Sequence, residues 1–394
     1  MKKDWTIKKL GELSTEKMSY GTSAPSCDYD GLVRYIRITD INDDGTLNED
    51  YVSPKSYEEK HVLKDGDIVF ARTGATVGKT YCYHSSNEKY VYAGYLIRLR
   101  PDKTIVNPDY LYYTTKSKEY LDFIKNSQAV AAQPNVNAEK YSNFEIPLPP
   151  LEEQKRIVAV LDKKFAQIET LKTAAEKNLQ NTKQLFQSEL EKAFSNTSWE
   201  KKRLGDLCES FEYGTSKKSS PNGKVPVLRM GNIQNRELDF TDLVYTNDEI
   251  EIEKFMLHKG DVLFNRTNSP EWVGKTAVFN EDFPAIFAGY IIRINYDRKR
   301  IDPYFLNYWL NSDSTMKYGF SIMTSSVHQA NISGSKLAEY LFPLPPLEEQ
   351  KHIVVHLDSL SEKVHQLKEI YTKQLADCDE LKQSLLQKAF EGEL

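Results

Sequence analysis

Residues 347–394 show the clearest hydrophobic pattern in the chain. Neither proline nor glycine occurs from Leu347 to Phe390, and apolar residues recur at alternating steps of four and three. This spacing is the heptad repeat of a coiled coil, and it predicts a helix of roughly 44 residues, some 65 Å long. The predicted seam consists of Ile353, Leu357, Leu360, Val364, Leu367, Tyr371, Cys378, Leu381 and Leu385, with a polar position at Gln374.

A second segment, from Leu151 to Phe194, has the same character. Both segments follow a Pro-Pro pair and open with Leu-Glu-Glu-Gln, and proline followed by acidic residues suits the first turn of a helix. Because a lone helix would expose its apolar stripe, we expect the two helices to pair. Full-length pairing in this chain order must be antiparallel, with the globular parts at opposite ends of a pseudo-two-fold rod. The seam of this helix is Ile157, Leu161, Ile168, Leu171, Ala175 and Leu185, with polar positions at Lys164, Asn178 and Thr182.

The helices belong to a larger repeat, in which a whole module of about half the chain is written twice. Shared segments lie at a nearly constant offset and run through both the globular part and the helix. The matching pairs are Leu10–Leu13 with Leu204–Leu207, Tyr20–Ser23 with Tyr213–Ser216, Gly66–Thr73 with Gly260–Thr267, Val77–Thr80 with Val273–Thr276, Ala93–Arg98 with Ala288–Arg293, and Pro147–Lys155 with Pro343–Lys351.

Each globular part mixes strand and helix signals. Asp67–Phe70 and Tyr95–Leu99 are short, rich in branched residues and bounded by glycine, which predicts strands. Asn107 followed by Pro108 predicts the start of a helix, with asparagine as the N-cap. The fold class expected is therefore α+β: two homologous globular domains, separated by two long helices that pair as an antiparallel coiled coil.

Composition adds a few limits. The chain has 394 residues and a net charge of −5, which argues against a nonspecific polyanion binder but leaves room for a local basic face. The N-terminal residues are not a secretory signal, and no apolar run is long enough for a membrane helix. Four scattered cysteines without a CxxC pair fit a reducing, cytoplasmic setting with structural thiols.

The order of globular domain, Pro-Leu-Pro-Pro-Leu-Glu-Glu-Gln helix, globular domain and second such helix resembles the specificity subunits of type I restriction–modification systems. The stretch Gly66–Lys79 and the ending Gln387–Leu394 carry the same resemblance, which covers the whole chain. It implies target recognition domains at residues 1–146 and 199–342, with spacer helices at 147–198 and 343–394.

The resemblance also implies partners and activity. The family reads a bipartite DNA site with a nonspecific gap set by the spacer helices. Two methyltransferase subunits dock on the specificity subunit, and motor-nuclease subunits join for cleavage. The chain itself would be non-catalytic and would bind no cofactor, because S-adenosylmethionine would sit on the methyltransferase subunits, which flip out the target base.

The loop Gly74–Thr80 superficially resembles a phosphate-binding P-loop, but it has three residues between its glycines where four are needed, and the second copy lacks the first glycine. We interpret it instead as a loop that carries cations and hydroxyls toward DNA, or as a shared turn with solvated charges. The two globular domains differ between their shared motifs, so the two half-sites are expected to differ. Residues common to both copies cannot explain that difference, so they are expected to hold phosphates or to build the loop. They are Arg72, Thr73 and Lys79 in the first copy and Arg266, Thr267 and Lys275 in the second.

Other candidate DNA-binding residues lie in loops that match between the copies. Tyr20, Thr22 and Ser23, like Tyr213 and Thr215, could bind phosphate, although a simple turn explains them equally well. Asn and Gln can pair with adenine and Arg with guanine, so loops that differ between the copies are expected to read bases. The remaining candidates are Arg37, Gln133 and Asn135 in the first copy and Lys217, Lys218, Arg229, His328, Gln329 and Asn331 in the second. The glutamines and asparagines among them occur in both copies, which favours scaffold or backbone roles, whereas His328, Lys217 and Lys218 are more distinctive.

Two other classes of function were weighed. A coiled-coil adaptor without DNA binding would explain the rod and the acidic charge, but not the repeated Arg-Thr and Val-Gly-Lys-Thr loops. A self-contained enzyme would need a doubled constellation of acids, histidines or nucleophiles, and the sequence contains none. His352 and His356 lie one helical turn apart but have no counterpart in the first copy, so no metal site is expected.

Overall fold

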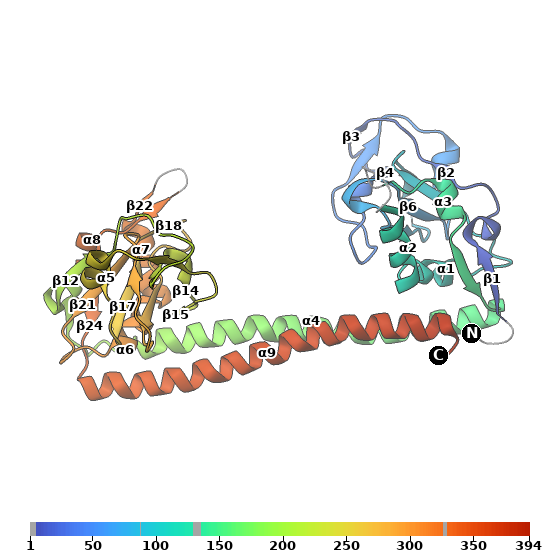
Figure 1. The fold of residues 1–394 in the computed structure, drawn as a ribbon. Helices are drawn as coiled ribbons and strands as arrows, with labels where there is room; N and C mark the ends of the chain where they lie inside the picture. The colour runs from blue at the N-terminus through green and yellow to red at the C-terminus, as the bar shows by residue number, and fades with distance from the viewer. Residues whose placement is uncertain (1–4, 87, 129–134, 326–328) are drawn as a thin grey trace. The chain divides into compact units, whose positions relative to one another are not determined.

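The computed structural model describes residues 5–86, 88–128, 135–325 and 329–394, and its fold is shown in Figure 1. The chain divides into two compact units, one formed by residues 1–176 and 373–394 and the other by residues 177–372. Each unit therefore contains one globular domain and segments of both long helices. Among the described residues, none of the helices combines the length and apolar character needed to cross a bilayer.

The first unit is built around an antiparallel sheet with the strand order β2-β9-β6-β7. A short antiparallel pair, β1 with β10, joins the two ends of the domain, and β4 pairs in parallel with β8. The strands are β1 Thr6–Lys9, β2 Ser19–Tyr20, β3 Ser26–Asp28, β4 Val33–Ile36, β5 Val52–Pro54, β6 Ile68–Ala71, β7 Thr80–Cys82, β8 Lys89–Tyr92, β9 Leu96–Leu99 and β10 Glu145–Leu148. The helices are α1 Pro108–Thr114, α2 Lys118–Gln128 and α3 Ala138–Ser142.

The second unit repeats this plan, with the sheet order β12-β21-β17-β19. Its ends pair through β11 and β24, and β13 pairs in parallel with β20. The strands are β11 Lys201–Arg203, β12 Cys208–Tyr213, β13 Val225–Leu228, β14 Ile233–Gln234, β15 Glu237–Leu238, β16 Val244–Thr246, β17 Asp261–Asn265, β18 Thr267–Asn268, β19 Thr276–Phe279, β20 Ile286–Phe287, β21 Ile291–Tyr296, β22 Thr324–Ser325, β23 Ala330–Asn331 and β24 Leu341–Pro343. The helices are α5 Glu249–Phe255, α6 Pro303–Leu310, α7 Asp313–Ile322 and α8 Gly334–Ala338.

The two predicted strands and the predicted helix start are confirmed by β6, β9 and α1. The side chain of Asn107 accepts hydrogen bonds from the backbone N–H groups of Asp109 and Tyr110, as an N-cap should. In the second unit Asp302 caps α6 in the same way. The predicted α+β class with a twofold repeat is thus confirmed.

The long helices are α4 Leu151–Ala193 and α9 Leu347–Glu391, close to their predicted limits. In the first unit they run antiparallel, because Lys172 pairs with Asp379 at 3.1 Å and Glu169 pairs with Lys382 at 3.1 Å. The end of each helix packs into the domain of the other module. Phe390 meets the ring of Tyr110 in the first unit, and Phe194 meets Phe305 in the second.

The repeated Pro-Pro-Leu-Glu-Glu-Gln motif fixes each helix to its own domain. Gln154 is fully buried; its amide nitrogen donates to the carbonyl oxygens of Pro149 and Ile105, and its oxygen accepts from the N–H of Asn107. Gln350 makes the equivalent three contacts in the second unit. Because a buried amide with every partner in place defines one geometry, this glutamine sets where the helix leaves the domain.

The predicted coiled-coil seam is buried or half-buried at most of its apolar positions, as expected, and wrong at three of them. Ile168, Ala175, Leu357, Val364 and Cys378 are buried as predicted, but Leu171, Leu185 and Leu381 are 59%, 49% and 47% exposed. The helices are rotated because they also pack on the domains. Phe165 and Phe186, outside the predicted seam, contact Tyr113 at 5.5 Å and Tyr308 at 6.4 Å between ring centroids.

Candidate nucleic-acid interface

One group of side chains recurs at the same place in both units, where the central strands β6 and β17 end. The guanidinium of Arg72 lies over the ring of Tyr20, 4.8 Å from its centroid, and that of Arg266 lies 4.7 Å from the centroid of Tyr213. Both tyrosines are exposed. A guanidinium on an aromatic face keeps its charge and most of its donors available for another partner.

The tyrosine hydroxyls are held by the short helices that follow. The hydroxyl of Tyr20 accepts a hydrogen bond from the N–H of Ala138, at the start of α3, at 3.2 Å. The hydroxyl of Tyr213 accepts from Gly334, at the start of α8, at 2.8 Å. Ring and arginine are therefore positioned by backbone rather than by flexible side chains.

Residues from the loop before these helices complete the group. Thr73 and Asn135 face each other in a β-bridge, and Thr267 pairs with Asn331 in the same manner. The amide of Asn331 donates to the hydroxyl of Thr267 at 2.7 Å. The structure thus brings together predicted residues that lie more than 60 positions apart, although their role in binding DNA stays a prediction.

Charge separates these two arginines from the other predicted cations. Within the described parts of the chain, no carboxylate pairs with Arg72 or Arg266, and the Nε atom of each is buried without a hydrogen-bond partner. Four of the other predicted cations are neutralised by acidic residues at close range: Arg37 by Asp40 and Asp50, Lys79 by Asp43, Lys217 by Asp248 and Glu251, and Arg229 by Asp242. Of the remaining lysines, Lys218 is exposed and Lys275 lies over the ring of Trp272.

Two of these ion pairs also shift acid–base equilibria. The hydrogen bond that Arg37 donates to Asp40 raises the pKa of the Arg37 guanidinium, and the hydrogen bond that Lys217 donates to Asp248 raises the pKa of Lys217. A cation already satisfied by carboxylates gains little from a phosphate, since it must first give up its own partner. Arg72 and Arg266 are therefore the stronger phosphate-binding candidates.

The predicted Tyr-Gly-Thr-Ser segments form tight turns beside these arginines. A Cβ atom on Gly21 would lie 2.1 Å from the carbonyl oxygen of Tyr92, so only glycine fits there. The hydroxyl of Thr22 accepts from the N–H of Ala24 at 3.2 Å, and that of Thr215 accepts from Lys217 at 3.1 Å. The threonines thus shape the turn, while Ser23 and Lys218 are exposed.

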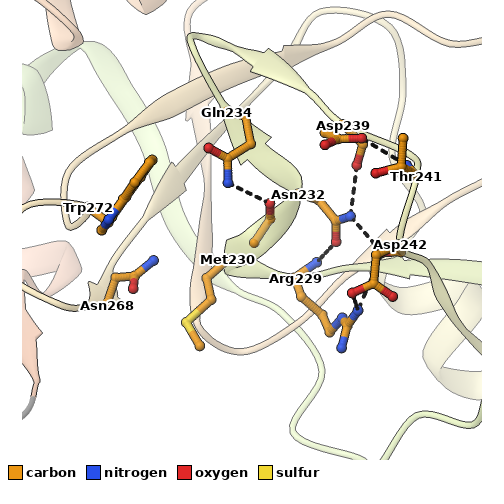
Figure 2. Close-up of a pocket in the computed structure, with 10 residues that line it drawn as sticks. Arg229, Met230, Asn232, Gln234, Asp239, Thr241, Asp242, Asn268 and Trp272 are labelled. Carbon is orange, nitrogen blue, oxygen red and sulfur yellow. Dashed lines mark hydrogen bonds and ion pairs between the residues drawn. The ribbon is translucent and has the colours of Figure 1, made fainter. Parts of the chain in front are cut away.

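The two units differ in the loop that connects β6 to β7 in the first unit and β17 to β19 in the second. In the first unit Lys79 reaches the carbonyl oxygen of Ile41 at 3.3 Å. In the second unit Lys275 instead lies 3.2 Å from the ring centroid of Trp272, and burial lowers the pKa of this lysine. This longer loop closes one side of a cavity of about 390 Å³ (Figure 2). The cavity is lined by Arg229, Met230, Gly231, Asn232, Gln234, Asp239, Thr241, Asp242, Asn268 and Trp272.

Two exposed tyrosines beside the arginines escaped the sequence analysis. Tyr95 and Tyr290 are 62% and 52% exposed, and their carbonyl oxygens accept hydrogen bonds from the N–H groups of Arg72 and Arg266, each at 3.1 Å. Both stand in the shared Ala-Gly-Tyr segments, so the repeat itself could have marked them. The predicted residues Gln133 and His328 lie outside the described residues, and Gln329 is exposed next to β23.

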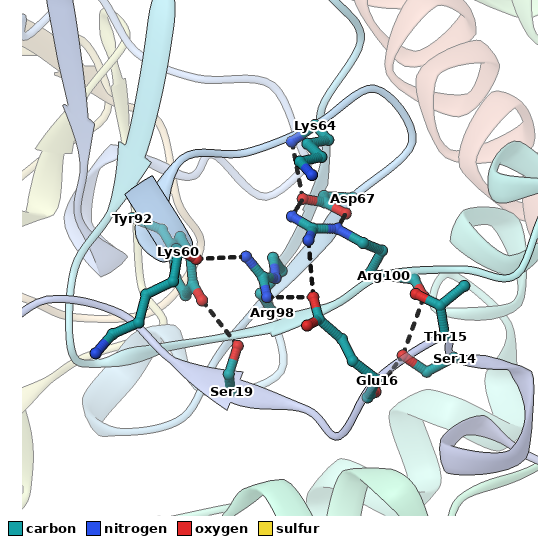
Figure 3. A network of polar contacts seen from close by, with 10 residues as sticks. All are labelled: Ser14, Thr15, Glu16, Ser19, Lys60, Lys64, Asp67, Tyr92, Arg98 and Arg100. Atoms are coloured by element: carbon teal, nitrogen blue, oxygen red, sulfur yellow. Dashed lines mark hydrogen bonds and ion pairs between the residues drawn. The ribbon is translucent and has the colours of Figure 1, made fainter. Parts of the chain in front are cut away.

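A second repeated arginine has a structural environment instead. Arg98 is buried and donates to Glu16 at 2.5 Å and to the carbonyl oxygen of Lys60 at 2.7 Å (Figure 3). Arg100 reaches Glu16 and Asp67 from the other side. In the second unit Arg293 contacts Glu212 and Asp261 in the same way. These ion pairs tie the edge of each sheet together, so repetition alone does not mark an arginine for DNA.

The fold and the two related faces define a protein with a tandemly duplicated recognition module. The family model of the type I restriction modification DNA specificity domain matches residues 2–180 and again residues 196–374. The chain therefore belongs to the type I restriction–modification DNA specificity family, which confirms the resemblance.

Individual relatives agree with this assignment. The type I restriction enzyme StySPI specificity subunit of Salmonella potsdam is 28% identical, over 87% of this chain and 78% of the relative. The EcoKI specificity subunit of Escherichia coli strain K12 is 27% identical, over 93% of this chain and 83% of the relative.

Solved structures share the fold. A chain from the type I R-M system matches with a TM-score of 0.80 and 23% identity, covering 100% of this chain and 99% of that one. The HsdS subunit from Thermoanaerobacter tengcongensis matches with a TM-score of 0.63 and 23% identity, covering 100% and 98%.

Proposed function

We propose that this chain is the DNA-reading specificity subunit of a type I restriction–modification complex. Each unit contacts one half of a bipartite, asymmetric site on duplex DNA, and the chain itself performs no chemistry. The observation that carries the proposal is that the same arrangement occurs in both units: Arg72 lies over the exposed ring of Tyr20, and Arg266 lies over that of Tyr213. Neither arginine has a carboxylate partner among the described residues. Two such cationic points in one chain suit a ligand with repeated negative charge.

Residues common to both units and residues that differ between the units have different roles in this proposal. Arg72, Arg266 and their neighbouring tyrosines are the same in both units, so they hold the phosphate backbone and fix the register of each domain. The base-reading residues lie where the units differ. In the second unit the best candidates are Asn268 and Gln234, whose amides can pair with adenine, on the rim of the cavity closed by Trp272.

The long helices supply the second surface that the function needs. Leu171 and Leu381 in the first unit, and Leu185 and Ile370 in the second, are about half exposed on α4 and α9. Apolar side chains repeated along a helix in this way are typical of a protein-binding surface. We assign them to two methyltransferase subunits, which bring S-adenosylmethionine; motor-nuclease subunits complete the cleaving complex.

The adaptor alternative also predicts protein binding by the helices, so the DNA face must decide between the two functions. An adaptor has no need of two arginines that lie beside exposed tyrosines and, in the part of the chain that the structure describes, have no carboxylate partner. Burying part of an unpaired guanidinium costs folding free energy, which a bound phosphate would offset.

The proposal is tested by a methylome. This chain is expressed with the methyltransferase encoded beside it, and modified adenines are mapped by single-molecule sequencing with and without the chain. We expect one bipartite motif with a fixed gap, present only when the chain is present. No new modification, with the partner shown to be folded and bound, would favour the adaptor.

Two variants of the same experiment examine the architecture. Replacing residues 1–150 with the first domain of another family member should change one half of the motif and leave the other half unaltered. Inserting one heptad in each of α4 and α9 should lengthen the gap. An unchanged gap would mean that the helices do not set the distance between the half-sites.

A further inference from the structure

Three side chains of the first unit, away from the arginine face, converge on one point. Cys82 ends strand β7, His84 follows two residues later, and Asp109 lies in the first turn of α1. The sulfur of Cys82, a ring nitrogen of His84 and a carboxylate oxygen of Asp109 all lie within 4.8 Å of one another. The Nε2 atom of His84 is 3.2 Å from Oδ1 of Asp109.

The separations are close to those that a tetrahedral metal ion requires. Zn²⁺ binds sulfur, nitrogen and oxygen at about 2.0–2.3 Å, so neighbouring ligand atoms in its shell lie about 3.3–3.8 Å apart. The His84–Asp109 separation of 3.2 Å lies just below that range, and the largest adjustment the three donors need is on the order of 1 Å. His84 can make it, since its side chain is 64% exposed.

The other two donors are held rigidly. Cys82 pairs with Ile68 in the β6–β7 ladder, and the N–H of Asp109 is bound by the Asn107 cap. A site with two fixed ligands and one adjustable ligand is largely preformed, which lowers the conformational cost of binding.

Burial shifts the acid–base equilibria of two of the three side chains. Burial raises the pKa of the Cys82 thiol, and Asp109 and Asp65 nearby raise it further. Burial also raises the pKa of the Asp109 carboxyl. Protons therefore compete with a metal ion for both groups, and it is the convergence of the three donor atoms that supports the site. The same burial makes Cys82 a poor nucleophile, so a catalytic Cys–His pair explains the cluster less well than a metal site does.

The second unit provides an internal comparison. β7 and β19 occupy the same place in their sheets, and so do α1 and α6, which puts Val278, Asn280 and Tyr304 where the first unit has Cys82, His84 and Asp109. The shared fold therefore does not need these three donors. Their meeting in one unit calls for an explanation specific to that unit.

We propose that Cys82, His84 and Asp109 form a Zn²⁺ site, with water as the fourth ligand, that clamps the end of β7 to the start of α1. The donor set of one thiolate, one imidazole and one carboxylate is of the kind that zinc accepts. The site lies within the first unit and does not depend on the proposed DNA-reading function. It departs from the expectation of no metal drawn from sequence spacing.

The test uses Co²⁺ as a spectroscopic probe for zinc, with the reduced, chelator-treated full chain. We expect one Co²⁺ per chain, a sulfur-to-cobalt charge-transfer band in the near ultraviolet, and displacement of that band by Zn²⁺. Cys82→Val and His84→Asn each introduce the residue of the second unit. Losing a direct ligand should weaken Co²⁺ binding by more than the roughly 10–100-fold that outer-shell changes cost.

Matched controls separate this site from others in the chain. Cys27→Ser removes a half-buried thiol elsewhere in the unit, and His352→Asn removes a histidine of α9; both should keep the band. Because His84 is mostly exposed, His84→Asn should fold normally, as circular dichroism can verify. The proposal is overturned if the wild-type chain shows no thiolate band, or if the band survives His84→Asn at unchanged affinity.

Discussion

Replacing Arg72 and Arg266, which have no carboxylate partner among the described residues, gives the sharpest test of the proposed DNA-binding surface. In Arg72→Gln and Arg266→Gln one positive charge disappears from each unit, while the side chain keeps its polar character. No carboxylate among the described residues is left behind unpaired, so the folded protein should change little. Any loss of DNA affinity then reports the missing contact rather than a damaged domain.

The magnitude follows from counterion release. Each phosphate contact contributes about 0.9 to the slope of log affinity against log salt concentration. A fourfold rise in salt, from about 50 to 200 mM, therefore costs each such contact about 3.5-fold in affinity. Each single variant should flatten the slope by about 0.9 and the double variant by about 1.8, because the arginines lie in different units and share no partner.

The assay is fluorescence anisotropy of the chain together with the methyltransferase proposed as its partner, on duplexes with the bipartite site expected from the methylome and with a scrambled site. Arg203→Gln is the control, since Arg203 is exposed and pairs with Glu339 at 3.3 Å. It should leave the slope unaltered. Unchanged slopes for both arginine variants would refute a phosphate contact, and a loss confined to one base position would make that arginine a base reader.

Three further predictions concern stability and metal binding. Gly21→Ala should destabilise the first unit by about 1–3 kcal/mol, because the new methyl group meets the carbonyl oxygen of Tyr92. Urea unfolding followed by peptide-resolved hydrogen exchange measures the stability of each unit, and an unaffected first unit would contradict the prediction. By the same measurement, Arg98→Met should lower the free energy of unfolding by about 1–3 kcal/mol, and Arg298→Met should lower it by less than about 1 kcal/mol. The reason is that Arg98 is buried and Arg298 is half exposed, so equal effects would argue against burial as the cause. Co²⁺ affinity should rise about tenfold per pH unit between about pH 6.5 and 8. The reason is that the thiol of Cys82, whose pKa is raised by burial, must release a proton when it binds the metal. An affinity that does not change with pH would exclude thiolate ligation.

Local signals in the sequence were sufficient where neighbouring residues decide the structure. Asn107 and Pro108 specify a helix start through their own hydrogen-bonding groups, and α1 begins there. The Pro-Pro pairs and the stretches without proline or glycine likewise predicted α4 and α9 nearly to the residue. The twofold repeat established two related domains before any contact was known.

The rotation of the long helices could not be read in this way. A heptad pattern shows that a helix has an apolar stripe, but the stripe must be shared between the partner helix and the domain. Phe165 and Phe186 pack on domain tyrosines, and this turns Leu171 and Leu185 outward. Only the tertiary structure determines which surface a given leucine faces.

The candidate sites show the same division. The sequence by itself determined the doubled module, its α+β class, its paired long helices and the repeated arginines. It could not distinguish Arg72, which has no acidic partner among the described residues, from Arg98, which is buried in an ion-pair network. Nor could it predict that His84 and Asp109 lie together. Those differences depend on residues distant in the chain that folding brings within a few ångströms. Charge compensation and metal ligation act over such distances in space, irrespective of separation along the chain, so only the tertiary structure decided them.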